Sequence, residues 1–406
     1  MVAMVTVEQQ LPPPVTDAAE VASIAAEIAR TGWFALDLEF MTEGRYVAEL
    51  SLVQVGWGDH DTPTVAAIDP LSVDPRPVLE LAARDDIEVI IHSAQADLAL
   101  IGAAFGVRAS RVFDTQIAAA FLGMGEQIGY APFVQRTLGL SVDKGGQFTE
   151  WLRRPLSADQ LRYALDDVLH LLPAWTGVER ELRDRGRLEW VNEECARFAA
   201  TWSERIPPDL MYRRVSGWAT LRPRQQGALR GVAAWREREA LAANRPPSRF
   251  IADRTMLELA RRPPRSIEDL RDVRGMSDGA ARRYGDAIIE ALRAGEQDPP
   301  PLELMPKPLP PAAQAWAGVL GGLVQAHCRD ADIAARFVAS RSDLEAVALW
   351  WFDGDRDTAP DVPLLHGWRR ELAGEVVLRW LRGSMALVAD ADSPFGFRLV
   401  ELPSEG

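Results

Sequence analysis

The chain has 406 residues and a formal charge of −14, from 45 Lys and Arg against 59 Asp and Glu. Its composition is 47% hydrophobic and 26% charged, which excludes a fully disordered polypeptide, and its length suffices for two or three ordinary cores. The acidic balance argues against a protein that coats nucleic acid through bulk charge, but it leaves room for an enzyme with a local basic surface. No apolar run approaches the roughly 20 residues that cross a bilayer, and the N-terminus lacks the pattern of a signal peptide. We therefore expect a cytoplasmic protein without membrane association.

The two cysteines, Cys195 and Cys328, limit the metal chemistry that the chain can support. They are too few for a cysteine-based zinc site, and a structural disulfide is not expected in a reducing compartment. Any metal site must therefore use oxygen ligands or the five histidines.

The first half of the chain changes from a strand pattern to a helical pattern. Residues 1–15 hold three consecutive prolines and are expected to be a flexible tail, followed by an amphipathic helix over residues 16–30. Four short apolar runs then predict strands, at residues 33–38, 48–55, 64–68 and 88–91. Apolar residues at the helical period predict helices at residues 97–105, 115–122, 158–172 and 178–200. This order predicts an α/β domain over residues 16–205, in which helices cover a mixed sheet.

The second half of the chain reads as helical and is divided by proline-rich breaks. The sequence IPPDLMYRR interrupts the pattern, so we expect a linker at residues 206–216 and a small helical domain at residues 217–297. Residues 298–311 hold seven prolines and form a second, semi-rigid linker. A second all-helical domain is expected at residues 312–406, with a weakly alternating stretch at residues 385–402 that could form a hairpin. The cluster at residues 350–352, Trp-Trp-Phe, could be core or an exposed stacking surface, and core is the favoured interpretation.

Asp37 and Glu39 lie two residues apart in the first predicted strand, WFALDLEF, so their carboxylates share one face of the sheet. Two adjacent acids repel each other unless a cation lies between them, and oxygen-only ligands favour Mg²⁺ or Mn²⁺. Asp-x-Glu also occurs at residues 86–88 and 343–345, but those copies follow charged or polar residues and are interpreted as solvated.

Asp97 follows the strand at residues 88–91, in the first turn of the next predicted helix. It could serve the helix dipole alone, or its carboxylate could reach the acidic face of the neighbouring strand. His92, at the end of that strand, could assist the chemistry or be a hydrogen-bonded structural residue.

Tyr163 and Asp167 are four residues apart in a helix whose start is marked by the capping-box spacing of Ser157 and Gln160. They therefore share one helix face. Tyr163 could instead be a core residue, with Asp167 a solvated neighbour of His170.

Taken together, these segments resemble the ribonuclease D family of 3′-to-5′ exonucleases. The resemblance covers about residues 30–180 in order and rests on DLEF, LSLVQVG, AAIDPL, IIHSAQADL, FDTQIAAAFLG, LGLSVDKGGQFTEWLRRPLS and YALDDVLHLLP. It implies a ribonuclease H-like fold and a site of four acids and a tyrosine, the DEDDy group. The acids that it implies as metal ligands are Asp37, Glu39, Asp97 and Asp167, and Tyr163 is implied to position the attacking water. The residues after Lys144, Gly-Gly-Gln-Phe, depart from the family pattern and put loop contacts to the substrate in doubt.

The resemblance implies a metal-dependent exoribonuclease that uses two divalent ions, Mg²⁺ or Mn²⁺, and trims the 3′ ends of tRNA or other structured RNA precursors. Two ions stabilise both the attacking and the leaving oxygen of a phosphodiester, and water activated by a metal replaces a Ser or Cys nucleophile. The expected partner is a single-stranded 3′ end of RNA, and no obligate protein partner is evident. A DNA exonuclease of the same chemistry and an inactive nucleic-acid-binding adaptor remain as alternatives.

Residues 217–293 carry 16 Arg against 10 acids, a local excess of positive charge in an acidic chain. The stretch GALRGVAAWREREALAANRPPSRFIADRTMLELARRPPRSIEDLRDVRGMSDGAARRYGDAIIEAL resembles the helicase and ribonuclease D C-terminal (HRDC) domain. This resemblance implies an accessory that binds single strands, although a charged helix face can also be merely solvated. Residues 312–382 have similar helical spacing and could be a diverged second copy.

Overall fold

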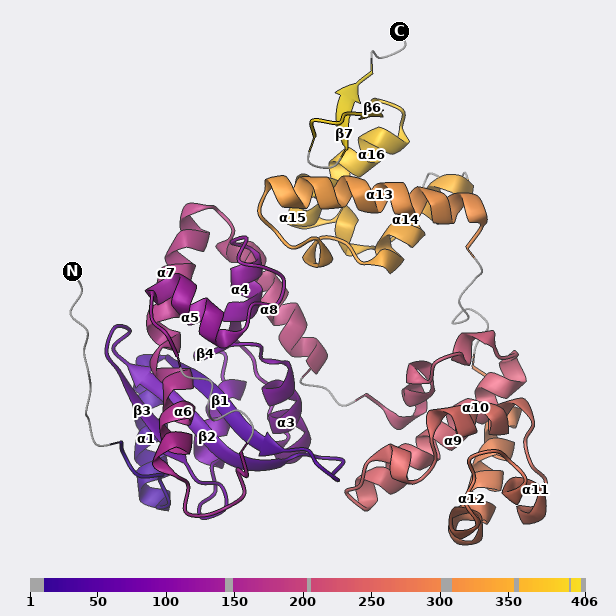
Figure 1. Ribbon diagram of the computed structural model, residues 1–406, viewed down its shortest axis with the longest axis horizontal. Coiled ribbons are helices and arrows are strands. Elements are labelled where there is room, and N and C mark those ends of the chain that lie inside the picture. Colours follow the sequence, from indigo (N-terminus) through magenta and orange to yellow (C-terminus); the bar gives the residue numbers. More distant parts are fainter. Residues whose placement is uncertain are drawn as a thin grey trace.

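A five-stranded mixed sheet forms the centre of the N-terminal part of the chain (Figure 1). The computed structural model describes residues 11–142, 149–202, 206–300, 309–353, 358–393 and 396–402. The strands, in the spatial order β3-β2-β1-β4-β5, are β1 (Trp33–Met41), β2 (Glu49–Gly58), β3 (Pro63–Ile68), β4 (Glu88–Ile91) and β5 (Val112–Asp114). β1 pairs antiparallel with β2 and parallel with β4, so the expected mixed sheet is confirmed.

Two features of this sheet differ from the sequence prediction. β5 was not predicted, because three residues are too short to show an alternating pattern. Val15, assigned to the flexible tail, is buried and bridges to Ile68 at the edge of the sheet. Residues 1–10 of that tail lie outside the described residues.

Helices cover both faces of the sheet. Val21, Ile24 and Ile28 of α1 join the apolar side chains of one face in a common core. α6 packs across β1, β2 and β3 on the other face (Figure 1). The helices of this part are α1 (Ala18–Thr31), α2 (Arg76–Leu79), α3 (Gln95–Phe105), α4 (Thr115–Ala120), α5 (Tyr130–Leu138), α6 (Ala158–Leu169), α7 (Leu171–Asp184) and α8 (Leu188–Trp202).

The helical region after α6 is divided differently from the prediction. The helix expected at residues 178–200 is interrupted at Gly186, whose φ of +67° is a left-handed conformation that favours glycine. The helix expected at residues 158–172 ends at Leu169, and α7 begins at Leu171. The chain therefore turns twice, and α7 and α8 pack back toward the edge of the sheet near β4 and β5.

Residues 206–300 form a separate helical core (Figure 1). Tyr212 and Val215, in the stretch expected to be a linker, are buried in this core because their side chains pack with α9. Its α-helices are α9 (Pro223–Ala242), α10 (Asp253–Arg261), α11 (Ile267–Arg271) and α12 (Asp278–Gln297). α9 and α12 approach closely because Gly227, Gly231 and Gly295 lie at their crossing. A Cβ atom on Gly231 would lie 2.1 Å from the carbonyl oxygen of Ala291, so only glycine fits at this position.

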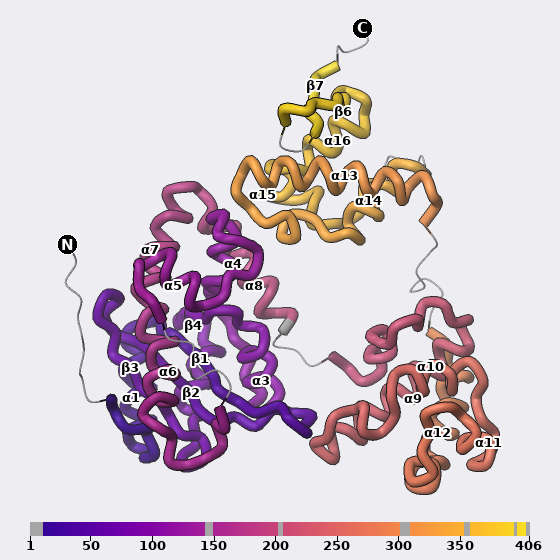
Figure 2. Tube along the Cα trace, viewed as in Figure 1, coloured from indigo at the N-terminus to yellow at the C-terminus, as the bar shows by residue number. Residues whose placement is uncertain are grey.

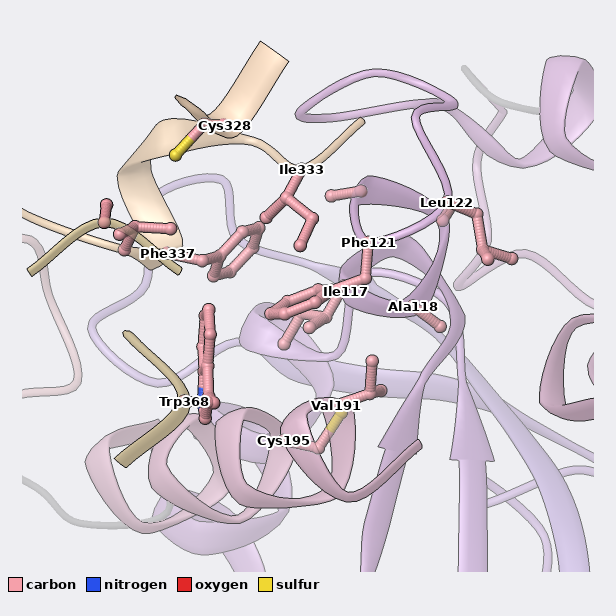
Figure 3. Close-up of a cluster of buried hydrophobic side chains, with 14 of the residues drawn as sticks. Ile117, Ala118, Phe121, Leu122, Val191, Cys195, Cys328, Ile333, Phe337 and Trp368 are labelled. Carbon is pink, nitrogen blue, oxygen red and sulfur yellow. The ribbon is translucent and has the colours of Figure 1, made fainter. Parts of the chain in front are cut away.

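The C-terminal elements share a hydrophobic core with the N-terminal part. Phe121 of the α4 end packs against Phe337 and Trp368, with ring centroids 5.3 Å from each (Figure 3). Arg369 is buried and pairs with Glu193 and Glu194 of α8. The elements are α13 (Pro311–Asp330), α14 (Arg341–Asp353), α15 (Gly367–Arg369), α16 (Glu375–Leu381), β6 (Met385–Ala389) and β7 (Phe397–Glu401).

The aromatic cluster at residues 350–352 is only partly core. Trp351 is buried and Trp350 is partly buried, whereas Phe352 is 47% exposed, so the interpretation of all three as core was wrong. The helical period explains the difference, because three consecutive residues of α14 cannot all face one side. The hairpin considered for residues 385–402 is present as β6 paired antiparallel with β7.

The β1–β2 hairpin also contacts the helical core of residues 206–300. The backbone N–H groups of Tyr46 and Val47 donate to Oδ1 of Asn244, at 3.1 and 2.9 Å. The Tyr46 hydroxyl donates to Oε2 of the buried Glu237 at 2.8 Å. Figure 2 shows this hairpin reaching the end of α9. The hairpin whose first strand carries Asp37 and Glu39 therefore contacts the helical core of residues 206–300 directly.

Candidate active site

β1 presents two carboxylates on the face of the sheet that α6 covers. Asp37 and Glu39 alternate with the buried Leu36 and Leu38, whose side chains pack on the opposite face with α1. Asp37 pairs in register with Gln54 of β2, and the Gln54 amide donates to Oδ2 of Asp37 at 3.3 Å. The strand pairing therefore fixes where both acids lie.

α6 brings a third carboxylate and a tyrosine to this face. Its start is fixed by a capping box in which Ser157 and Gln160 satisfy each other's backbone N–H groups. Tyr163 and Asp167 lie one turn apart on α6, and both line one pocket with Asp37 and Glu39 of β1.

Three acids meet in one pocket of about 250 Å³. Carboxylate oxygens of Asp37, Glu39 and Asp167 all lie within 4.8 Å of one another. The residues that line the pocket are Asp37, Leu38, Glu39, His92, Tyr130, Tyr163, Asp167 and Leu171. No lysine or arginine is among these lining residues, so nothing on the described wall offsets the negative charge.

Asp97 is placed differently from the other predicted acids. It lies in the first turn of α3, as the sequence predicted, but it is 6% exposed and does not line the pocket. Its carboxyl is nonetheless close enough for the charges of Asp37 and Glu39 to add to the effect of burial, which raises its pKa well above the ordinary value. The structure thus gathers three acids and Tyr163 around the pocket, with Asp97 buried in electrostatic contact with them.

The turn before α3 is held by Asp114, a residue that the sequence analysis did not single out. The buried Asp114 carboxylate accepts from the backbone N–H groups of Ser93 and Ala94 at 3.0 and 2.9 Å. Ser93 has a φ of +66°, a conformation that a non-glycine residue adopts only where its surroundings hold it. Asp114 therefore positions the start of the helix that carries Asp97.

The pKa values of the clustered acids are raised, because burial penalises their charged forms. Burial raises the pKa of Asp37 to about 7, and burial together with the charge of Asp37 raises that of Glu39 to about 8. The pKa of Asp167 is about 9, through burial and then the charges of Asp37 and Glu39. Carboxyls whose pKa values are raised in this way have no positively charged partner nearby. This is the electrostatic environment expected of carboxylate metal ligands in the absence of the metal.

Tyr163 and His92 are both neutral on this wall, but they have different environments. Burial and the charge of Asp167 raise the pKa of Tyr163, so its hydroxyl keeps its proton and can donate a hydrogen bond. Both ring nitrogens of His92 are occupied, by Oγ1 of Thr115 at 2.9 Å and by the carbonyl oxygen of Ile128 at 3.0 Å. Burial lowers the pKa of His92, so it has the features of the structural alternative.

Tyr130 also lines the pocket and was missed by the sequence analysis. Its hydroxyl donates to the carbonyl oxygen of Asp166 at 2.8 Å, next to Asp167. The preceding loop is held to the α3 side of the site, because the Gln116 amide and Nε2 of His92 both bond to the carbonyl of Ile128. Tyr130 thereby links the two sides of the pocket. No sequence spacing indicates a contact between a side chain and a backbone carbonyl 36 residues away.

Comparison with known proteins places this site in a class. Residues 12–183 match the 3′-5′ exonuclease family, and residues 225–292 match the HRDC domain. The fold and the acidic pocket therefore define a 3′-to-5′ exonuclease, an enzyme, followed by an HRDC domain. Among the described residues, none of the helices combines the length and apolar character that crossing a membrane requires.

The relatives identify the family within this class. The chain is 35% identical over 396 residues to ribonuclease D of Zymomonas mobilis, covering 93% of this chain and 96% of the relative. It is 35% identical over 385 residues to ribonuclease D of Sphingobium indicum, with the same coverage. The crystal structure of Escherichia coli RNase D superposes with a TM-score of 0.78 at 27% identity, covering 92% and 99% of the two chains. The chain belongs to the ribonuclease D family and is a 3′-to-5′ exoribonuclease.

Proposed function

We propose that the chain removes nucleotides from the 3′ end of RNA with two divalent ions, Mg²⁺ or Mn²⁺, held by Asp37, Glu39, Asp97 and Asp167. The observation that carries this proposal is the convergence of three carboxylates within 4.8 Å in a pocket whose described wall has no cation. Asp97 would supply the fourth carboxylate from the first turn of α3.

The residues present fit divalent ions. Carboxylate oxygens are the ligands that Mg²⁺ and Mn²⁺ prefer, and the four acids offset the charge of two such ions. The raised pKa values of Asp37, Glu39 and Asp167 support the proposal, because charging these buried carboxyls carries an electrostatic cost that a cation would remove. When bound, the ions would supply charge stabilisation for the attacking and leaving oxygens and would lower the pKa of a bound water.

Tyr163 would position the attacking water through its hydroxyl. The group is half-buried, faces the pocket and keeps its proton, so it acts as a hydrogen-bond donor rather than as a base. Its ring lies 6.2 Å from that of the buried Trp151, which limits the orientations that it can adopt. A fixed donor adds orientation without needing to ionise.

The proposed substrates are 3′ ends of tRNA or other structured RNA precursors. The Escherichia coli relative is described as an exoribonuclease involved in structured RNA processing, and this likeness supports the proposal. In this proposal residues 16–205 are the catalytic domain, and the helical core of residues 206–300 and the C-terminal elements from α13 onward are accessory parts.

The test is a time course on matched single-stranded RNA and DNA labelled at the 5′ end. The proposal predicts a ladder that shortens from the 3′ end of RNA, requires Mg²⁺ or Mn²⁺ and stops with EDTA. Asp37→Asn should abolish the ladder, whereas Asp59→Asn, which changes an exposed acid outside the pocket, should leave it unchanged. Degradation of RNA by Asp37→Asn at the wild-type rate would contradict the assigned site, and faster degradation of DNA than of RNA would contradict the proposed substrate.

A further inference from the structure

An ion pair holds the segment that precedes α6, residues 149–156, to the sheet. Arg154 of this segment forms two parallel hydrogen bonds with Asp69, from Nε to Oδ2 and from Nη2 to Oδ1, both at 2.7 Å. Asp69 directly follows β3, and its side chain is 5% exposed. Two parallel bonds of this kind fix the orientation of a guanidinium group as well as its distance from the carboxylate. Neither residue lines the acidic pocket.

The other N–H groups of Arg154 donate to backbone carbonyls. Nη2 donates to the carbonyl of Ser51 in β2 at 2.6 Å, and Nη1 donates to the carbonyls of Trp151 and Arg153 at 2.7 and 3.0 Å. Together with the bonds to Asp69, these bonds engage every N–H group of the guanidinium within the protein. Arg154 therefore connects the sheet to the segment before α6, and it keeps no N–H group for a phosphate of the substrate.

Trp151 is the part of this segment that contacts Tyr163. It is 2% exposed, and it packs with Leu52 and Ala67 of the sheet and with apolar side chains of α6. The centroid of its ring lies 6.2 Å from that of Tyr163, and the two ring planes are tilted by 41°. The position of the Tyr163 ring therefore depends on the position of Trp151.

A second hydrogen bond holds the same segment to the start of α6. Nε2 of Gln160 donates to Oγ1 of Thr149 at 3.0 Å, while Oε1 of Gln160 accepts from the backbone N–H of Ser157 in the capping box. Gln160 and Tyr163 are neighbours on the helix surface, because positions i and i+3 of a helix lie side by side. The segment is thus fixed at one end to α6 and near the other end to the sheet.

We propose that Arg154, anchored by Asp69, is a positioning residue that fixes the Tyr163 hydroxyl relative to the acids of β1. The inference rests on the proposed role of Tyr163 in orienting the attacking water. Residues 149–156 have no regular secondary structure, whereas β2 is paired on both sides, so loss of the anchor should move the segment and not the sheet. A displaced Trp151 would leave the tyrosine ring less constrained, and reaction rates depend steeply on the alignment of the reacting groups.

The test measures kcat and KM for RNA hydrolysis by the full chain at saturating Mg²⁺. Four proteins form a cycle: the wild type, Arg154→Lys, Tyr163→Phe and the double variant. Arg154→Lys keeps a positive charge beside Asp69, so it preserves the ion pair. An ammonium group lacks the planar fork that bonds to a carboxylate and several carbonyls at once. The matched control is Arg153→Gln, which removes the charge of the exposed neighbouring arginine and should keep the wild-type kcat.

Arg154→Lys should lower kcat about fivefold to tenfold and leave KM unchanged, because the tyrosine hydroxyl loses alignment with the reacting groups. In the Tyr163→Phe background the same substitution should change kcat by less than about twofold, because no hydroxyl remains to be misplaced. A purely stabilising role of Arg154 would instead lower kcat by the same factor in both backgrounds, and that result would overturn the proposal.

Hydrogen exchange, measured by mass spectrometry without RNA, reports on the anchor independently of activity. Arg154→Lys should speed the exchange of the backbone N–H groups in residues 149–156, whereas Tyr163→Phe and Arg153→Gln should not. Unchanged exchange in Arg154→Lys would overturn the proposal. A slow Tyr163→Phe together with a fully active Arg154→Lys would refute this inference alone, whereas a Tyr163→Phe variant with the wild-type kcat would refute the proposed role of Tyr163 and this inference with it.

Discussion

Replacing Asp167 with Asn should stabilise the metal-free protein while abolishing its activity. The pKa of Asp167 rises from 3.8 to about 9 on folding, through burial and the charges of Asp37 and Glu39. Above about pH 4 the unfolded carboxyl ionises, whereas the folded one holds its proton. Stability therefore falls as the pH rises from about 4 to about 9, and it levels off beyond that. An asparagine does not ionise, so the variant loses this penalty.

The size of the effect follows from the same pKa values. A pH of 7 is about 3 units above the pKa of the unfolded carboxyl. At about 1.4 kcal/mol per unit, the gain in the free energy of unfolding from Asp167→Asn has an upper limit of about 4 kcal/mol. For a domain of this size, each kcal/mol moves the thermal midpoint by roughly 2–4 °C, so the upper limit of the gain is about 8–16 °C. The gain should vanish near pH 4.

The assay is thermal unfolding in EDTA, followed by circular dichroism at about pH 4, 6 and 8. Excess Mg²⁺ should then raise the midpoint of the wild type but not that of Asp167→Asn, because a bound ligand stabilises only the state that binds it. The control is Asp159→Asn, an exposed acid in the first turn of the same helix, which should be neutral or slightly destabilising. An Asp167→Asn variant that unfolds at or below the wild-type midpoint at pH 8 would refute the electrostatic reasoning.

The remaining predictions concern positioning, proton competition and packing. Tyr163→Phe should lower kcat about 10- to 100-fold without changing the Mg²⁺ concentration that gives half activity, and an unchanged kcat would remove its role. Tyr130→Phe loses the hydrogen bond to the carbonyl of Asp166, so it should lower the free energy of unfolding by about 1 kcal/mol and raise the Mg²⁺ concentration that gives half activity. If both quantities stay at the wild-type value, Tyr130 does not position α6. Apparent Mg²⁺ affinity, measured by calorimetry, should increase from about pH 6 to 9 because ions compete with protons for the carboxyls, and a flat profile would contradict the raised pKa values. Gly231→Ala should destabilise the HRDC domain by about 1–3 kcal/mol or more, while Gly279→Ala, which has open space, should not; equal stabilities would show that the helix crossing tolerates a Cβ atom.

Much of the fold could be predicted because burial and periodicity are visible in the sequence. β1, β2, β3 and β4 coincide with the apolar runs, since strands inside a covered sheet are apolar on both faces. β5 was not predicted because it has only three residues. The break at Gly186 was not predicted because the helical period of apolar residues continues across it. Tertiary packing, and not local pattern, decides both features.

The site was predictable where its residues share one element. Spacing of two in a strand and four in a helix placed Asp37 with Glu39 and Tyr163 with Asp167, and the structure brings these pairs to one pocket. Their catalytic roles, and that of Asp97, remain predictions. Tyr130 could not be found in this way, because its contact crosses between elements and ends on a backbone carbonyl.

The packing of the C-terminal elements against the N-terminal part could not be predicted from the sequence either. Phe121 and Trp368 lie in apolar stretches that each suit the core of their own segment, and neither indicates that the two segments share one core (Figure 3). The buried pair of Arg369 with Glu194 joins residues 175 positions apart. The order of the elements in the chain does not specify which helical faces meet.

The proposed function requires that the acidic cluster hold a pair of divalent ions at the end of an RNA strand. Its most direct test is the anomalous diffraction of crystals soaked in Mn²⁺ with a short, non-hydrolysable RNA. Two manganese peaks are expected, bounded by the carboxylates of Asp37, Glu39, Asp97 and Asp167. Maps that show the RNA 3′ end in the pocket but no manganese between these carboxylates would contradict it.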